Sequence, residues 1–403
     1  MKKGILCLAI TLFLATESPL LCVAAEVTLL ESPAVPAASL SRVVANNNGS
    51  LILSWVESDD ESDALYYSSL VNEEFSKPEK ISSGKDWFVN WADFPFVIAT
   101  DRSMTAHWLK RRDAGTYNYD VVAVFRSPLT NLWSEPRIIH TDGVSAEHGF
   151  VSMLPLADDK TLISWLDGRN TTGHKPDDAA KHLSGGMTLR AGIFDADGNT
   201  ITEWQLDDLV CDCCQTSVAM SSRGPVIVYR DRSETELRDI YITRFDEQSW
   251  TTPIPVYKDN WEISGCPVNG PSVTALNRQI AVGWFSAKND QPSVNLSLSS
   301  DDGKSFANTV TVAQGNTNGR VSVAMLRSGK VAISWLETAG KLALLKVASY
   351  DFDGNLLDTA VVAETTSSRQ SGFPVITSRN DDIFVTWTDV LEKKHVRVAR
   401  IRF

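Results

Sequence analysis

One apolar segment that ends in an aromatic residue recurs seven times along the chain. The copies are rich in β-branched and aromatic residues, which is typical of buried strands. A period of about fifty residues with several short strands per unit indicates a β-propeller, because one four-stranded blade cannot bury its faces alone. The copies predict seven blades in an all-β fold, and they end at Trp55, Trp108, Trp165, Tyr229, Trp284, Trp335 and Trp387.

Further strand-like segments surround each copy. An apolar segment precedes it, a segment of alternating apolar and polar residues follows it, and a fourth strand comes after an aromatic residue. Examples of the preceding and following segments are 94–99, 150–154, 272–276, 64–70 and 294–299. Each blade is therefore expected to contain four strands. The regular aromatic ends are expected to pack between blades.

The two ends of the chain are expected to share one blade. The last copy ends at Phe403 after three strands, whereas the strand-like segment Val27–Glu31 stands before the first full set. Pairing these two parts would remove two open sheet edges and close the ring. No linker or low-complexity tract interrupts the repeats, so we expect residues 26–403 to be one propeller domain.

Residues 1–25 have the pattern of a signal peptide. Lys2 and Lys3 precede an apolar run that ends near Leu14, and Val23-Ala24-Ala25 resembles a cleavage site. The apolar run is too short to span a bilayer, and no later stretch is apolar for long enough. We therefore expect an exported monomer, periplasmic or extracellular, without a membrane span.

Acidic residues outnumber basic ones. The chain has 38 Lys and Arg against 50 Asp and Glu, a formal net charge of −12. This sign disfavours non-specific binding to nucleic acids and other polyanions. The expected partners are a small molecule, a glycan or a metal ion.

A turn motif in the fifth repeat is similar to a motif of a known superfamily. The segment Ser299-Ser-Asp301-Asp-Gly303-Lys-Ser305-Phe306 matches the Asp-box pattern, and looser versions occur at 195–199, 245–250 and 351–355. On these residues the chain resembles the sialidase-like, BNR-repeat β-propeller superfamily. The Asp-box is a structural turn in which side chains bond the local backbone, so it marks the fold and carries no chemistry.

The resemblance implies a set of catalytic residues that this sequence does not reproduce. Sialidases use an N-terminal arginine element, further arginines that clamp a carboxylate, a tyrosine–glutamate pair and an acidic aspartate. This chain has Ala38-Ser39-Leu40-Ser41 at the place of the first arginine, and Arg42 is out of register. The known enzymes also have six blades. We therefore do not expect an exo-sialidase, although activity on sialic acid or related glycans is the main alternative.

The cysteines of the mature chain lie in matching loops of two neighbouring repeats. Cys211, Cys213 and Cys214 precede the fourth repeat, and Cys266 precedes the fifth. In a propeller such loops emerge around the central channel, so the four thiols are expected to converge. Disulfides are the ordinary state of cysteines in an exported protein. The competing interpretation is a metal site for Cu or Zn, or a redox site, with His148 as a neighbour.

We expect two further groups of residues to lie on the same face of the ring. The weak catalytic candidates are Arg230, Asp231 and Arg232, whose alternative role is a surface ion-pair cluster. The ligand-binding candidates are Trp87, Trp91, Arg169, Arg230, Arg232 and Trp261, although the tryptophans could equally cap the channel. An insertion at 168–186 adds His174 and His182 to this face. The sequence thus favours a binding protein over an enzyme, and a scaffold for protein partners is a third possibility.

Overall fold

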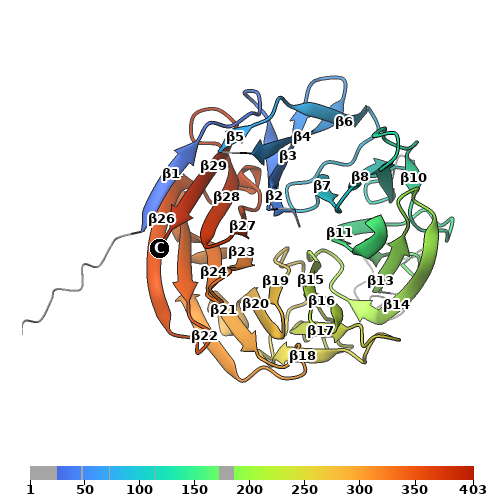
Figure 1. The fold of residues 1–403 in the computed structure, drawn as a ribbon. Coiled ribbons are helices and arrows are strands. Elements are labelled where there is room, and N and C mark those ends of the chain that lie inside the picture. The colour runs from blue at the N-terminus through green and yellow to red at the C-terminus, as the bar shows by residue number, and fades with distance from the viewer. Residues whose placement is uncertain (1–24, 47–48, 72, 114, 172–185) are drawn as a thin grey trace, which may run out of the picture.

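The computed structural model describes residues 25–46, 49–71, 73–113, 115–171 and 186–403. These residues form seven β-sheets arranged as the blades of a ring (Figure 1). The predicted seven-bladed propeller is therefore confirmed. Among the described residues, no helix has the length and apolar character needed to cross a membrane. The predicted signal peptide and both His174 and His182 lie outside the described residues.

The first three blades follow the predicted order of strands from the channel outward. The first contains β2 (Ser39–Ala45), β3 (Leu51–Ser58), β4 (Asp63–Val71), β5 (Glu74–Phe75) and β6 (Glu79–Gly84). Both β5 and β6 pair with β4, so two short strands take the place of the single fourth strand that the repeats predict. The second contains β7 (Phe96–Ala99), β8 (Met104–Arg111), β9 (Tyr119–Arg126) and β10 (Arg137–Ile138). The third contains β11 (His148–Pro155), β12 (Thr161–Asp167), β13 (Met187–Phe194) and β14 (Thr200–Val210).

The next three blades repeat the same antiparallel order. The fourth contains β15 (Ser217–Ser221), β16 (Gly224–Arg230), β17 (Ile240–Arg244) and β18 (Ile254–Tyr257). The fifth contains β19 (Ser272–Leu276), β20 (Gln279–Ser286), β21 (Ser293–Ser299) and β22 (Asn308–Gln314). The sixth contains β23 (Thr317–Met325), β24 (Val331–Ala339), β25 (Leu342–Tyr350) and β26 (Leu356–Thr366).

The seventh blade joins the two ends of the described chain. It contains β27 (Val375–Arg379), β28 (Asp382–Asp389), β29 (His395–Arg402) and the first strand, β1 (Glu26–Leu30). β1 pairs antiparallel with β29, with Glu26 opposite Arg402 and Leu30 opposite Val398. The predicted closure by the N-terminal strand is confirmed, and Figure 1 shows this blue strand beside the red ones.

The aromatic strand ends pack between neighbouring blades, as predicted. Trp165 of the third blade lies in one apolar cluster with Phe125 of the second, and Trp284 of the fifth lies with Val228 of the fourth. Trp165 and Trp284 have no exposed surface. These residues therefore hold adjacent blades together and are not available for ligand stacking.

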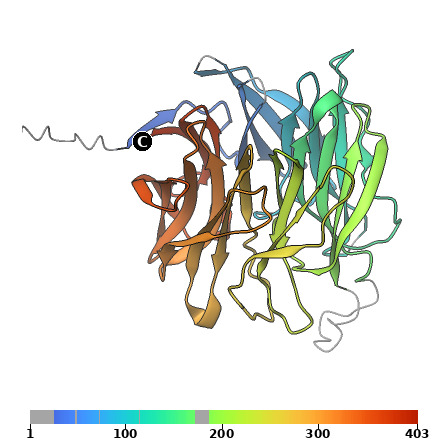
Figure 2. The ribbon, with the colours of Figure 1, turned by 60° about the horizontal axis from the view of Figure 1, so that its bottom comes forward.

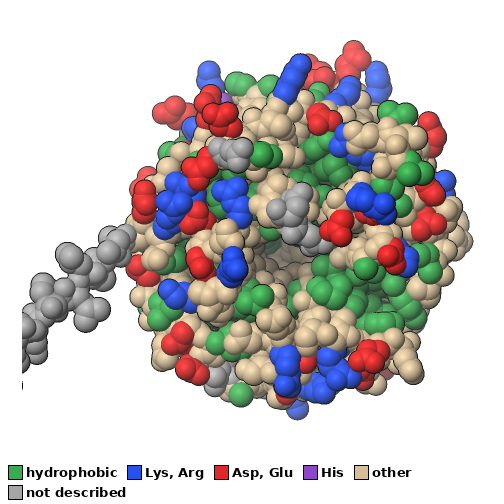
Figure 3. Space-filling model, in the orientation of Figure 1, with side chains coloured by type: hydrophobic (Ala, Val, Ile, Leu, Met, Phe, Trp, Pro, Cys, Tyr) green, Lys and Arg blue, Asp and Glu red, His purple; other side chains and the backbone are tan. Residues whose placement is uncertain are grey.

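The antiparallel blades give the ring two different faces. The connections between the first and second strands and between the third and fourth emerge on one face, which we call the Asp-box face. The connections between the second and third strands and between blades emerge on the other, which we call the channel face. Figure 2 shows connections at both ends of the blades, and Figure 3 shows one end of the ring, with acidic and basic side chains interspersed around a central hollow.

The Asp-box turn is held by its own side chains. Asp301 accepts hydrogen bonds from the backbone N–H and hydroxyl of Ser305, at 3.0 and 2.7 Å. The Ser299 hydroxyl accepts the N–H of Gly303, whose φ of +76° is in the left-handed region that favours glycine. Phe306 packs against an apolar cluster that the fourth and fifth blades share. The motif thus closes a turn and plugs a blade junction.

Candidate functional site

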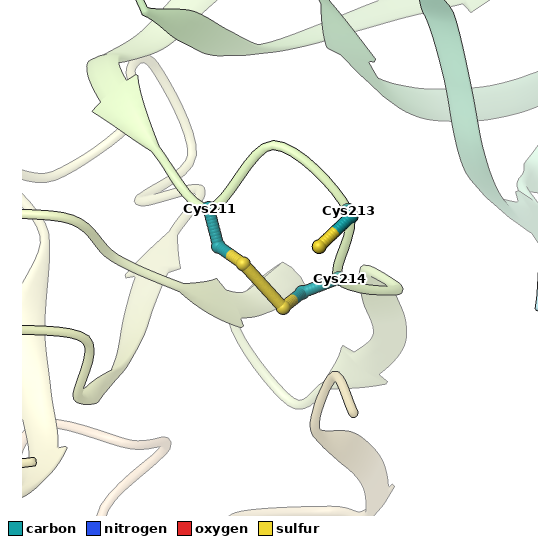
Figure 4. A group of neighbouring side chains, drawn as sticks. All are labelled: Cys211, Cys213 and Cys214. Atoms are coloured by element: carbon teal, nitrogen blue, oxygen red, sulfur yellow. A yellow bond between two sulfur atoms is a disulfide. The ribbon is translucent and has the colours of Figure 1, made fainter. Parts of the chain in front are cut away.

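The four cysteines converge on the channel face. Cys211 follows β14, and Cys213 and Cys214 lie in the same loop, while Cys266 lies in the loop before β19. The sulfur atoms of Cys211, Cys213 and Cys214 lie within 4.8 Å of one another (Figure 4). Two disulfides pair Cys211 with Cys214 and Cys213 with Cys266. The second bond joins the loops of neighbouring blades, as the staple interpretation predicts.

The cysteine cluster extends from the protein interior to the surface. Cys211 and Cys214 are buried, Cys213 is half-buried and Cys266 is exposed. An external thiol can therefore reach the bond between Cys213 and Cys266, whereas the bond between Cys211 and Cys214 is shielded. A disulfide sulfur is not a thiolate, so Cu or Zn could bind these residues only after reduction.

The loop that carries three of the cysteines also covers the channel. The side chain of Gln215 donates to the carbonyl of Ala92 at 2.9 Å and accepts the N–H of Gly270 at 2.8 Å. A Cβ atom added to Gly270 would lie 2.0 Å from the carbonyl oxygen of Gln215. The loops that carry these two residues are therefore so close that only glycine fits at position 270. Gln215 therefore links loops of three blades across the ring.

A small cavity lies below this loop in the central channel. It has a volume of about 80 Å³, and its lining includes Arg42, Asp93, Phe150, Gln215 and Phe373. Burial raises the pKa of Asp93 to about 7, against a backbone hydrogen bond from Phe150 that lowers it. Drug-sized ligands occupy pockets of roughly 300–1,000 Å³. The cavity itself can therefore hold only a few water molecules.

An ion-pair chain of charged residues lies beside the cysteines. Arg238 donates to the sulfur of Cys211 at 3.4 Å and to the carboxylate of Glu236 at 2.7 Å. Glu236 also accepts from Arg232 at 2.6 Å, and Arg232 reaches Asp212 at 3.0 Å. Burial alone would raise the pKa of Glu236, but the hydrogen bonds from the two arginines lower it. A guanidinium so close to Cys211 would stabilise its thiolate form.

The structure gives the three weak catalytic candidates different surroundings. Arg230 is buried and donates to the backbone carbonyls of Asn269, Arg238 and Phe285, which is a structural role. Arg232 is buried in the ion pairs described above. Asp231 is half-buried, and burial and the charge of Asp207 raise its pKa to about 7. Their catalytic role remains a prediction.

The predicted stacking tryptophans are covered by other side chains. Trp87 is buried and stacks on Trp108 with ring centroids 4.9 Å apart. Trp261 is buried between the edge of Phe285 and the guanidinium of Arg230. Each ring thus belongs to an apolar cluster, and a ligand could stack on either ring only after rearrangement.

Trp91 differs from the other two because it is only half-buried. Its ring stacks on Phe373, with centroids 5.5 Å apart. The guanidinium groups of Arg320 and Arg369 lie 5.1 and 5.7 Å from its centroid. Trp91 is therefore the best placed of the three for ligand contact, a role that remains a prediction.

A tyrosine–glutamate pair that sequence reasoning missed lies next to the channel. The hydroxyl of Tyr119 donates to Glu147 at 2.6 Å. Burial raises the pKa of Glu147 to about 8. The hydrogen bond from Tyr119 lowers this pKa, whereas the charge of Asp93 raises it further. The two residues meet because the start of β9 forms a bridge with the loop before β11. No sequence motif signals this pair, since it depends on how two blades pack.

His148 lies among carboxylates rather than beside the sulfurs. Its ring stacks on that of His140, with centroids 3.8 Å apart and an interplanar angle of 7°. Its Nε2 atom lies 3.2 Å from an oxygen of Asp142 and 3.6 Å from one of Asp167. Arg169, a predicted ligand-binding residue, forms a two-pronged ion pair with Asp167. The candidate neighbours of the cysteines thus belong to a second cluster.

Comparison with known proteins supports the fold. The sequence matches no model of a known protein family and no curated protein. The structure is similar to the Phage phi92 endosialidase, with a TM-score of 0.52 and 9% identity over 94% of this chain and 69% of that one. The fold is therefore that of a sialidase-like β-propeller.

Two other solved structures resemble the chain at lower scores. A mutant of the NanB sialidase from Streptococcus pneumoniae has a TM-score of 0.48 and 9% identity over 94% of this chain and 92% of that one. The α-L-arabinofuranosidase arb93a from Fusarium graminearum has a TM-score of 0.47 and 10% identity over 94% and 97%. At identities this low, no residue role transfers to this chain.

Proposed function

We propose that this protein is an exported binding protein whose cysteine cluster is a redox-dependent site for a soft metal ion, Cu(I) or Zn(II). The observation that carries the proposal is the convergence of four cysteines from two blades, three of them with sulfurs within 4.8 Å. Disulfides persist in oxidising compartments, so their presence supports export to the periplasm or the cell exterior.

Reduction converts the two disulfides into four thiols. Each disulfide takes up two electrons and two protons, which an external dithiol supplies as it closes to its own disulfide. Attack begins at the exposed bond between Cys213 and Cys266, and the freed Cys213 then lies within reach of the bond between Cys211 and Cys214. The inner bond can thus be reduced by exchange through Cys213.

The sulfurs of Cys211, Cys213 and Cys214 are close enough to share one ion, and Cys266, the partner of Cys213, is the fourth candidate ligand. Sulfur ligands lie about 2.3 Å from zinc, so two sulfurs on one tetrahedral ion are roughly 3.8 Å apart. The observed limit of 4.8 Å requires shifts of about 1 Å, within the reach of side-chain rotation. Metal binding releases the thiol protons, and Arg238 beside Cys211 favours the thiolate.

The test compares the protein in three states. The first is oxidised, the second is reduced by a dithiol that is then removed, and the third is reduced and then alkylated at its cysteines. The probe is Cu(I) titrated against a chromogenic chelator without oxygen. We expect one equivalent to bind the reduced protein only, and Cys266→Ser to weaken binding at least 100-fold. The matched control is Ser264→Ala, an exposed position in the same loop. Equal binding by the alkylated protein, or none by the reduced protein, would overturn the proposal.

Glycan hydrolysis is a second candidate because of the pair formed by Tyr119 and Glu147. A carboxylate that accepts a tyrosine hydroxyl can activate it as a nucleophile. Asp93, with its raised pKa, is close enough to interact with Glu147 electrostatically and could serve as an acid. Against this, Tyr119 is 1% exposed, Arg230 and Arg320 are buried, and Arg42 is half-buried.

A panel of fluorogenic sialosides and arabinosides separates the two functions. If the protein is a hydrolase, it releases the fluorophore and Tyr119→Phe abolishes release. The binding-protein proposal predicts no turnover of any member of the panel by either the oxidised or the reduced protein. Turnover that depends on Tyr119 would establish the alternative.

A further inference from the structure

We propose that His148, Asp142 and Asp167 form a second cation site, which takes a divalent ion of borderline hardness such as Zn(II). This site is separate from the cysteine cluster and does not depend on the function proposed above. Its three ligand atoms are one imidazole nitrogen and two carboxylate oxygens, all within 4.8 Å of one another. Nitrogen and oxygen ligands of this kind are common in zinc sites.

The backbone around His148 fixes which nitrogen is free. Nδ1 lies 3.3 Å from the carbonyl oxygen of Tyr119 and 3.2 Å from that of Ala146. Carbonyl oxygens only accept hydrogen bonds, so Nδ1 carries the hydrogen. The neutral ring then presents the lone pair of Nε2, which is the form that binds metals.

The free nitrogen faces groups that also cannot donate. Nε2 of His148 is fully buried and has no hydrogen-bond partner among the described residues. Its neighbours, Asp142 and Asp167, offer carboxylate oxygens at 3.2 and 3.6 Å. A buried acceptor surrounded by acceptors is unfavourable unless a cation lies between them. The cation is either a proton on Nε2 or a metal ion.

The distances match a shared metal ion. Ligands about 2.1 Å from a tetrahedral zinc lie roughly 3.4 Å from one another. The two observed distances, 3.2 and 3.6 Å, bracket this value. Neither carboxylate forms a hydrogen bond with Nε2 of His148, although both lie beside it. This arrangement is expected for three ligands around one metal ion, and less so for two carboxylates that accept a proton from Nε2.

Neighbouring side chains orient the three ligands. Nδ1 of His140 lies 2.7 Å from Asp142, whose other oxygen accepts the N–H of Val144. Arg169 holds Asp167 through two side-chain hydrogen bonds of 2.7 Å. Outer contacts of this kind fix the direction of metal ligands in known sites.

The local charge leaves room for a cation. The cluster contains four acidic side chains, Asp120, Asp142, Asp167 and Glu203, and three basic ones, Arg112, Arg169 and Arg190, joined in ion pairs. With both histidines neutral, one negative charge is uncompensated. A divalent ion therefore enters a site whose carboxylates are already buried and positioned.

The test uses the oxidised protein, so that the cysteines stay in disulfides and cannot bind metal. Zn(II) is titrated by calorimetry after chelator treatment, and Co(II) is used as a spectroscopic probe. We expect one equivalent of either ion, with the strong visible bands of tetrahedral Co(II) and no sulfur-to-cobalt charge transfer. His148→Gln, Asp142→Asn and Asp167→Asn should each weaken binding at least 100-fold.

The matched control is Asp86→Asn, the same change of charge in an exposed ion pair with Lys110. No binding by the wild-type protein would mean that a proton alone occupies the cluster and would overturn the proposal. Binding that survives all three substitutions would overturn it too. If a variant fails to fold, the wild-type Co(II) spectrum decides: tetrahedral bands support the site, and their absence refutes it. The cysteine proposal is unaffected by either result.

Discussion

The two faces of the ring are built in different ways. On the Asp-box face, the turn at Asp301 is closed by bonds between residues at most four positions apart. On the channel face, the Gln215 side chain bonds Ala92, 123 positions away, and a disulfide joins Cys213 to Cys266 across 53. The first face depends on local sequence, whereas the second exists only after the blades have assembled.

This difference explains what could be predicted from sequence. The strand repeats and the closure by the first strand follow from local patterns, and the structure confirms them. The turn at Asp301 also follows from local sequence, since its bonds join residues at most four positions apart. The convergence of Cys211 and Cys266 was predictable too, because matching loops of adjacent blades must meet. The pair of Tyr119 and Glu147 was not, since its 28-residue separation has no motif and depends on the packing of two blades.

His148 illustrates the same limit. Its position next to the cysteine loops in repeat order predicts that it joins them, but the side chain of His148 lies against His140 and Asp142. The burial of Trp87 and Trp261 could not be predicted from the sequence repeats either, because it depends on contacts with neighbours such as Trp108 and Phe285. Topology places a loop, whereas side-chain packing decides which groups are free.

The largest predicted effect comes from the bond between the two channel-face loops. Loop-closure entropy gives a disulfide that spans 53 residues about 4 kcal/mol of stability. We expect Cys213→Ser with Cys266→Ser to lower the free energy of unfolding by about that amount, measured by denaturant titration. Cys211→Ser with Cys214→Ser should cost about 2 kcal/mol, because that bond spans three positions. An equal cost for both pairs would contradict the cross-blade role.

A smaller effect is expected on the Asp-box face. Asp301→Ala removes the acceptor for the backbone and hydroxyl of Ser305 and should cost about 2 kcal/mol. The control Asp301→Asn keeps one carbonyl acceptor and should cost less. Cu(I) binding by the reduced protein should not change in either variant. A loss of metal binding would show that the two faces are coupled.

The smallest predicted effect is a pH dependence from the channel. The pKa of Asp93 is about 7 in the folded protein and about 3.9 when unfolded, so the folded state binds the proton more tightly. The resulting stability is full below pH 4 and is lost as pH rises through 7. Between pH 6 and 8 the free energy of unfolding should fall by about 1.4 kcal/mol from this residue.

Asp93→Asn tests this dependence because it stays neutral and keeps an acceptor for the N–H of Phe150. Denaturation curves at pH 6, 7 and 8 should show a shallower pH slope in the variant than in the wild-type protein. An unchanged slope would mean that Asp93 is ionised throughout this range in the folded protein.

The central claim is that the four cysteines can serve as one thiolate site. X-ray absorption at the zinc edge of the reduced protein, loaded with one equivalent of Zn(II) in the His148→Gln background, tests it most directly. We expect a first shell of sulfur about 2.3 Å from zinc, which Cys266→Ser reduces by one ligand. A first shell of nitrogen and oxygen without sulfur would contradict it.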